Sequence, residues 1–135
     1  MTDKELMERA VAAREYAYAP YSGFRVGAAL LAKNGKVYTG CNVENAAYTP
    51  TNCAERTAVF KAVSEGVLEF EKIAIVGGRY ESIADSCAPC GVCRQVLAEF
   101  CGRDFPILLG TPENVCVHTL GELLPYSFGK ADLNE

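Results

Sequence analysis

The dipeptide Asn34-Gly35, flanked on both sides by apolar residues, constrains the fold of this chain more than any other local feature. The segment 24–32 before it is apolar, and Val37, Tyr38 and Thr39 follow it. Asn-Gly between two such runs supplies the positive φ angles of a type I′ turn, which predicts a β-hairpin. The fold must therefore include an antiparallel pair of strands.

Helical and strand patterns alternate along the rest of the chain. Thr2 as N-cap and Glu5 in a capping box predict an amphipathic helix over 2–17. Further helices are expected from near Asn52 to Gly66, over about 89–100 and over 119–124, and further strands over 73–76, 106–109 and 115–117. This order predicts an α/β fold with three layers, α/β/α, around a mixed sheet of about five strands, antiparallel at the hairpin and parallel at the crossovers. Without a repeat or a linker, residues 1–135 are expected to form a single domain.

Composition and charge limit the classes of partner. Half of the residues are apolar and 22% are charged, as in soluble globular proteins. With 13 basic against 17 acidic side chains the net charge is −4, so no nucleic acid partner is expected. No apolar run is long enough to span a bilayer, and charged residues stand where a signal peptide is apolar, so we expect no membrane association and a cytoplasmic location. In that reducing compartment, the seven cysteines are expected to be core, metal-binding or catalytic residues.

Three of these cysteines stand at predicted helix N-termini. Cys53 lies at the predicted start of the second helix, and Cys90 and Cys93 open the third. Residues three apart on a helix are surface neighbours, so Cys90 and Cys93 can reach one ion and a ligand from another helix can complete the site. Sulfur-rich tetrahedral sites favour zinc, and the positive end of a helix favours thiolate. A Zn²⁺ ion is therefore predicted as cofactor.

Two residues after Cys53 suit a catalytic zinc site. Three thiolates around Zn²⁺ leave a charge of −1, which opposes deprotonation of a bound water. Arg56, three residues after Cys53, can donate hydrogen bonds to the cysteine sulfurs and offset that charge. Glu55 can accept a proton from the water and deliver it to a substrate nitrogen. Glu55 could instead close an ordinary capping box with Asn52.

These residues resemble a known enzyme family. Cys53-Ala54-Glu55 followed by Pro89-Cys90-Gly91-Val92-Cys93 is similar to the three-cysteine signature of zinc nucleobase deaminases. Within that superfamily the chain resembles the short, homotetrameric cytidine deaminases. The resemblance covers nearly the whole chain, in the segments 24–30, 42–46, 53–56, 90–95 and 124–128.

The resemblance implies an activity and a role for each matching residue. It implies hydrolytic deamination of cytidine and deoxycytidine to uridine and deoxyuridine in pyrimidine salvage, with a zinc-bound hydroxide attacking C4 and Glu55 as the proton shuttle. Cys53, Cys90 and Cys93 would be the zinc ligands, with water as the fourth. The implied partners are a small-molecule nucleoside and the other subunits of a homotetramer.

The remaining implied roles concern binding of the nucleoside. Ala54 would offer its backbone N–H to the base, Asn42 and Glu44 would hold the ribose hydroxyls, and Phe24 would flank the substrate. Phe128 would reach into a neighbouring subunit and stack on the pyrimidine. A carboxylate at the sugar favours free nucleosides, because it repels an attached phosphate.

Other interpretations remain open at this level. Cys87 could supply a fourth thiolate and make a closed structural zinc module. Cys90-Gly91-Val92-Cys93 could belong to a thiol oxidoreductase, and the rival deaminases act on a nucleoside-like antibiotic or on polynucleotides. Phe24 and Phe128 could be core aromatics, and Asn42 and Glu44 could be ordinary turn residues.

Four residues are given no chemical role. His118, the only histidine, is expected to be structural or on the surface, because no second catalytic group neighbours it in the sequence. Cys41, Cys101 and Cys116 have apolar sequence neighbours and no metal spacing, so they are expected to be packing residues.

Overall fold

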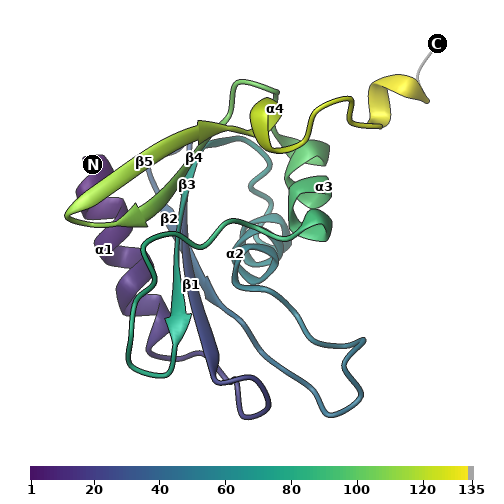
Figure 1. Cartoon of the computed structure of the whole chain (residues 1–135). Coiled ribbons are helices and arrows are strands. Elements are labelled where there is room, and N and C mark those ends of the chain that lie inside the picture. Colours follow the sequence, from purple (N-terminus) through teal and green to yellow (C-terminus); the bar gives the residue numbers. More distant parts are fainter. Residues whose placement is uncertain (134–135) are drawn as a thin grey trace.

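The fold is built on one five-stranded sheet with the strand order β2-β1-β3-β4-β5, shown in Figure 1. The structure is a computed structural model, and it describes residues 1–133. The β1–β2, β1–β3 and β4–β5 pairs are antiparallel, and β3–β4 is the one parallel pair. The strands are β1 Phe24–Ala32, β2 Val37–Cys41, β3 Phe70–Arg79, β4 Pro106–Thr111 and β5 Asn114–Thr119.

Helices cover both faces of this sheet. The α1 helix packs on one face, and α2 and α3 pack on the other (Figure 1). The helices are α1 Asp3–Arg14, α2 Ala54–Ser64, α3 Gly91–Phe100 and the short α4 Leu120–Leu123, with a 3₁₀ turn over Lys130–Asp132. The predicted three-layer α/β/α architecture with five strands is confirmed. None of the described helices is long and apolar enough to cross a lipid bilayer.

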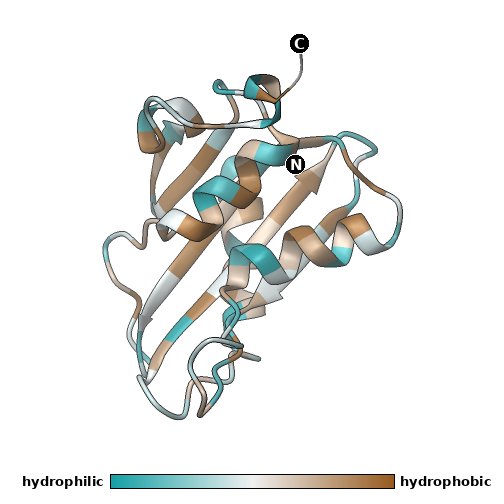
Figure 2. Cartoon of the chain, turned by 90° about the vertical axis from the view of Figure 1, so that its right-hand side faces the viewer, coloured by the Kyte–Doolittle hydropathy of each residue, from teal (hydrophilic) through white to brown (hydrophobic). Residues whose placement is uncertain are grey.

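The core consists of two apolar clusters, one on each side of the sheet. Along β1, Ala28 and Leu30 face α2 and α3, whereas Ala29 and Leu31 face α1. Successive strand residues point to opposite faces, so a strand covered on both sides must be apolar throughout. Figure 2, which views the sheet from the side of α2 and α3, shows largely hydrophobic strands behind these helices.

The hairpin forms where predicted, but its turn is of a different type. Gly35 has φ +90°, and Asn34 is not among the described residues with positive φ. Gly35 N–H donates to the Ala32 carbonyl at 3.0 Å, and Ala32 N–H donates to the Lys36 carbonyl at 2.9 Å. The loop therefore has three residues and ends in a left-handed glycine, in place of the type I′ turn.

Several predicted boundaries shift because neighbouring backbone competes for hydrogen bonds. The α1 helix ends at Arg14, before the predicted residue 17. The α2 helix begins at Ala54, because Asn52 is paired with Val43 through two backbone hydrogen bonds of 2.9 Å. The strand β3 extends well beyond 73–76, because it pairs along the whole length of β1. Parallel pairing is limited to β3–β4, since the crossover through α2 brings β3 antiparallel to β1.

Gly40 allows α2 to lie directly on β2. A Cβ atom at Gly40 would stand 2.5 Å from the Ala54 carbonyl oxygen and 2.5 Å from the Ala58 nitrogen. We expect Gly40→Ala to lower the free energy of unfolding by about 1–3 kcal/mol, because the helix backbone must move away. Urea unfolding measures the change. Gly129→Ala is the matched control, since a Cβ there meets nothing within 4 Å, and an equal loss in both variants would contradict the expectation.

Candidate metal centre and active site

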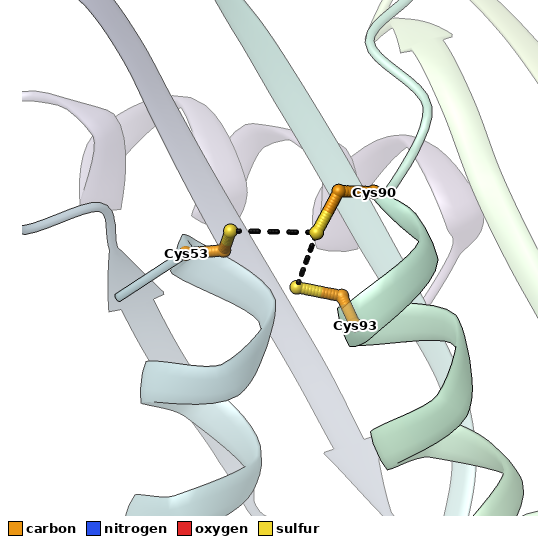
Figure 3. Close-up of side chains that lie close together, drawn as sticks. All are labelled: Cys53, Cys90 and Cys93. Atoms are coloured by element: carbon orange, nitrogen blue, oxygen red, sulfur yellow. Dashed lines mark hydrogen bonds between the residues drawn. The ribbon is translucent and has the colours of Figure 1, made fainter. Parts of the chain in front are cut away.

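The N-termini of α2 and α3 meet and bring three cysteines together. Cys53 and Cys90 are the N-cap residues of the two helices, with φ −77° and −69°. Neither thiol caps its own helix, and Figure 3 shows all three sulfur atoms pointing toward one another. The Sγ atoms of Cys53 and Cys90 are 3.6 Å apart, and those of Cys90 and Cys93 are 3.5 Å apart.

These distances fit ligands of one metal ion better than a disulfide. A disulfide joins its sulfurs at about 2.05 Å. Two sulfurs bound tetrahedrally to zinc, each about 2.3 Å from the ion, lie about 3.8 Å apart. The three sulfurs lie within 4.8 Å of one another, so small movements would bring them around a single ion. The donor set and its spacing therefore fit zinc.

Cys87 does not join this cluster. Among the described residues, the group of converging ligand atoms contains Cys53, Cys90 and Cys93 and no fourth member. Cys87 packs against the core on the α2 and α3 side, near Gly77, and burial raises the pKa of its thiol to about 11. The arrangement leaves the fourth position of a tetrahedral site open, as in catalytic rather than structural zinc sites.

Arg56 neutralises part of the charge on the cysteines. Its guanidinium donates a hydrogen bond to Cys53 Sγ at 3.2 Å. The pKa of Cys53 is lowered to about 5, chiefly by a hydrogen bond from Cys93 and, against the effect of burial, by Arg56. The same contact with Cys53 raises the pKa of Arg56, so the guanidinium stays charged. The lowered pKa favours the thiolate form of Cys53, which is the form that binds a metal ion.

Glu55 is buried beside the cysteines and does not cap the helix. Its exposed fraction is 4%, and the Asn52 amide donates to Thr57 Oγ1 at 3.1 Å instead of forming a capping box with Glu55. Burial raises the pKa of Glu55 to about 7, and the charge of Cys53 adds to the effect. A carboxyl group in this range can both accept and donate a proton near neutral pH.

Burial of Glu55 has a predictable effect on stability. The unfolded chain releases this proton near pH 4.5, whereas the folded protein keeps it up to about pH 7. Stability therefore falls as pH rises between these values, and at 1.36 kcal/mol per pH unit the cost reaches about 3 kcal/mol above pH 7. In the metal-free protein, Glu55→Gln is expected to raise the free energy of unfolding by about that amount at pH 8 and by little at pH 5. Urea unfolding with chelator and reductant measures it, and a pH-independent difference would contradict the assignment.

A cavity of about 210 Å³ opens next to the cysteine cluster. Six of the residues that the sequence predicts for the site line this cavity. They are Phe24, Asn42, Cys53, Ala54, Glu55 and Cys90. Val26, Thr51, Asn52, Cys87 and Ala88 complete the lining. Val26 lies in the matching segment 24–30, and Cys87 is a candidate fourth thiolate in the sequence. The fold brings Thr51, Asn52 and Ala88 to the cavity without a motif that places them there.

Asn42 and Glu44 already hold loop and strand backbone beside this cavity. The Asn42 side chain accepts from Val26 N–H and donates to the Phe24 carbonyl, both at 2.8 Å. Glu44 accepts hydrogen bonds from Tyr21 N–H, Ser22 N–H and the Ser22 hydroxyl. Partial burial by itself raises the pKa of Glu44, but the bonds from Ser22 and Tyr21 outweigh it and lower the pKa.

Glu44 faces a second cavity, of about 370 Å³, which shares Thr51 with the first. Phe128 lines neither of the two. It is 61% exposed, and its carbonyl accepts a hydrogen bond from Gln95 at 2.8 Å. The segment that carries it runs away from the sheet toward the C-terminus (Figure 1). Phe128 is therefore not a core aromatic.

Arg94 supports the cysteine cluster, although the sequence indicates no role for it beyond its place in the segment 90–95. Its guanidinium donates to the Pro89 carbonyl at 2.8 Å and to the Leu123 carbonyl at 2.5 Å. The turn before Cys90 is thereby fixed to the end of α4. Its position immediately after Cys93 is the sequence feature that could have indicated this supporting role.

The expectation for Cys116 is wrong. Cys116 is exposed on the edge strand β5, and its Sγ lies 3.4 Å from His118 Nε2. His118 therefore does have a reactive neighbour. Cys101 packs against the core as expected, with a pKa raised to about 12 by burial. Cys41 is partly buried, and burial raises its pKa as well.

Comparisons with known proteins agree with this geometry. The family model of the cytidine and deoxycytidylate deaminase zinc-binding region matches residues 1–109. A cytidine deaminase of Sporosarcina psychrophila is 49% identical over 135 residues, covering 99% of this chain and 96% of that protein. One of Halalkalibacterium halodurans is 48% identical over 136 residues, covering both chains completely.

Solved structures give the same result. The crystal structure of cytidine deaminase from Burkholderia pseudomallei matches with a TM-score of 0.87 and 50% identity, covering 95% of this chain and 100% of that chain. Cytidine deaminase from Mycobacterium tuberculosis matches with a TM-score of 0.80 and 42% identity, covering 96% and 99%. With this fold, this cysteine cluster and relatives that match along their whole length, the chain belongs to the cytidine and deoxycytidylate deaminase family.

Proposed function

We propose that this chain hydrolyses cytidine and deoxycytidine to uridine and deoxyuridine, with release of ammonia, as a single cytoplasmic domain in pyrimidine salvage. The observation that carries the proposal is the buried carboxyl of Glu55 beside three converging cysteine sulfurs, at the wall of one cavity. The relatives named cytidine deaminase support the choice of substrate.

Cys53, Cys90 and Cys93 would hold one zinc ion in each subunit. When bound there, zinc would lower the pKa of a water molecule and make it nucleophilic near neutral pH. Arg56 withdraws charge from Cys53 Sγ through its hydrogen bond and so favours that acidity.

Glu55 would move the protons of the reaction. Its carboxylate accepts a proton from the water as the oxygen attacks C4 of cytosine, and then delivers it to N3. Glu55 then takes the second proton from the new hydroxyl group on C4 and delivers it to the exocyclic nitrogen, so that the C4–N bond breaks, a carbonyl forms at C4 and ammonia leaves. Ala54 is the first residue of α2, so its N–H has no partner within the helix and can donate to the base.

The sugar would lie where the first cavity meets the second one at Thr51. Asn42 and Glu44 would bind the ribose hydroxyls with the hydrogen-bonding capacity that remains beyond their backbone contacts. Phe24, on the cavity wall, would flank the nucleoside. The pre-set orientation of Glu44 by Ser22 and Tyr21 reduces the entropy lost when substrate binds.

Glu44→Gln is expected to lower kcat/KM for cytidine by roughly tenfold to a hundredfold, since a hydrogen bond to a charged group contributes about 1.5–3 kcal/mol. The effect should be on KM, because Glu44 does not touch the reacting atoms. Steady-state kinetics of ammonia release measure it. Glu71→Gln, an exposed carboxylate on β3, is the control, and an unchanged KM in Glu44→Gln would remove Glu44 from the sugar site.

Phe128 would complete the pocket of another subunit in a homotetramer. Its high exposure and its place on a segment that leaves the body of the subunit support this role. An aromatic side chain that is exposed in one subunit can bury its face on a pyrimidine bound in the next. Sedimentation of the zinc-loaded protein tests the oligomeric state.

A substrate panel tests the proposed function directly. Ammonia release from the zinc-loaded protein is expected with cytidine and deoxycytidine, and little with cytidine phosphates, adenosine or single-stranded DNA. Release from another base but not from cytidine would overturn the proposal.

A further inference from the structure

The edge of the sheet carries a second group of reactive side chains, outside the metal centre. Cys116 Sγ lies 3.4 Å from His118 Nε2, and His118 Nδ1 lies 3.7 Å from Glu122 Oε2. The thiol and the carboxylate thus approach opposite nitrogens of one imidazole. A nucleophile next to a base that a third group orients is the arrangement that activates thiols. We call these three residues the Cys116 triad.

The fold explains why the Cys116 triad is both ordered and accessible. Cys116 and His118 pair with Leu109 and Ile107 of β4 and share their face of the sheet. The β4 side chains are buried, whereas Cys116 on the neighbouring edge strand is exposed. The thiol therefore meets solvent without any opening of the structure.

Glu122 is held in place independently of His118. It closes a capping box at the start of α4, accepting from Thr119 N–H at 3.2 Å and from the Thr119 hydroxyl at 3.0 Å. These hydrogen bonds lower the pKa of Glu122, so its carboxylate is charged when it faces the imidazole. This carboxylate faces the Nδ1 side of the ring, opposite the nitrogen that the thiol approaches.

Two other functions do not fit the Cys116 triad. Its potential ligand atoms do not form a converging group of the kind seen for Cys53, Cys90 and Cys93 among the described residues, because the ring separates the sulfur from the carboxylate. The cavity that Glu122 lines, with Arg103, Asp104, Thr119 and Gly121, includes neither the thiol nor the imidazole. An activated thiol without a substrate cavity suits modification by a small reagent from solution.

We propose that Cys116 is a site of thiol–disulfide exchange with low-molecular-weight disulfides. His118 Nε2 takes the proton from Cys116 Sγ, and the sulfur attacks one sulfur of the disulfide in line with its S–S bond. A new S–S bond forms, the old one breaks, and the departing sulfur takes the proton from His118. Cys116 is thereby oxidised to a mixed disulfide, and the reagent is reduced to one free thiol.

The test uses the zinc-loaded enzyme and less than one equivalent of the aromatic disulfide dithiobisnitrobenzoate. Release of the coloured thiol gives the rate, and mass spectrometry of peptides locates the mixed disulfide. We expect the fastest reaction at Cys116 and its disappearance in Cys116→Ser. His118→Gln should slow this reaction by at least about tenfold, because the thiol loses its base.

Charge variants separate a specific role of Glu122 from general electrostatics. Glu122→Gln keeps a side chain that can serve the capping box but removes the charge, and it should slow the exchange by a smaller factor than His118→Gln. Glu113→Gln, exposed on the same hairpin, should leave the rate unchanged. A fastest phase that maps to another cysteine, or a His118→Gln variant that reacts at the original rate, overturns the proposal.

Discussion

Replacing Glu55 with glutamine is expected to reduce kcat for cytidine by at least roughly 10²–10⁴-fold, the contribution typical of a general acid–base group. Glutamine has nearly the same size and fills the buried position beside the cysteines, but it cannot carry a proton from the water to N3. Zinc content and the secondary structure should stay unchanged. The reaction would then depend on proton transfer by solvent, which the burial of this side chain restricts.

Ammonia release under substrate saturation and metal analysis of the same samples are the measurements. Glu65→Gln, an exposed carboxylate just beyond α2, is the matched control and should keep full activity. A Glu55→Gln enzyme that retains both its zinc and its rate would exclude Glu55 as the proton carrier. Since the same substitution should stabilise the metal-free protein above pH 7, a loss of activity by unfolding is readily told apart.

The fold was predictable where one physical effect dominates. The apolar run of β1 and its Asn34-Gly35 turn placed the hairpin, because burial on both faces and a positive φ each demand particular residues. The turn type was not predictable from Asn34-Gly35. A three-residue loop needs only one residue with positive φ, whereas a type I′ turn needs two. The start of α2 depends on pairing between Asn52 and Val43, a contact that no local pattern reports.

The candidate site shows the same contrast between features that local sequence determines and features that depend on the fold. The convergence of Cys53, Cys90 and Cys93 could be predicted, because a shared ion needs thiols one helix turn apart and a further ligand from the start of another helix. The reactive surroundings of Cys116 were missed because they depend on where the sheet ends.

The metal itself is predicted to contribute both the activity and a measurable part of the stability. Prolonged dialysis against a chelator should reduce ammonia release to background and lower the midpoint of thermal unfolding. A ligand at a thousandfold excess over its Kd stabilises the folded state by about 4 kcal/mol. The structure gives the reason, because the N-termini of α2 and α3 meet through these thiols and their charge is offset by Arg56. Added zinc should restore both properties, and circular dichroism and ammonia release follow them in parallel.

Single cysteine variants decide whether the centre is open or closed. Cys93→Ala removes a fully buried thiol of the proposed zinc site and should abolish both tight zinc binding and activity, without rescue by added zinc. Cys87→Ala should retain both, because the Cys87 sulfur lies against Gly77 and outside the converging group. If the wild-type protein instead bound zinc without releasing ammonia, and Cys87→Ala lost that zinc, a fourth thiolate would occupy the position that water needs. Because a thiolate in that position cannot act as the nucleophile, ammonia release by both the wild-type protein and Cys87→Ala is the result on which the hydrolytic mechanism depends.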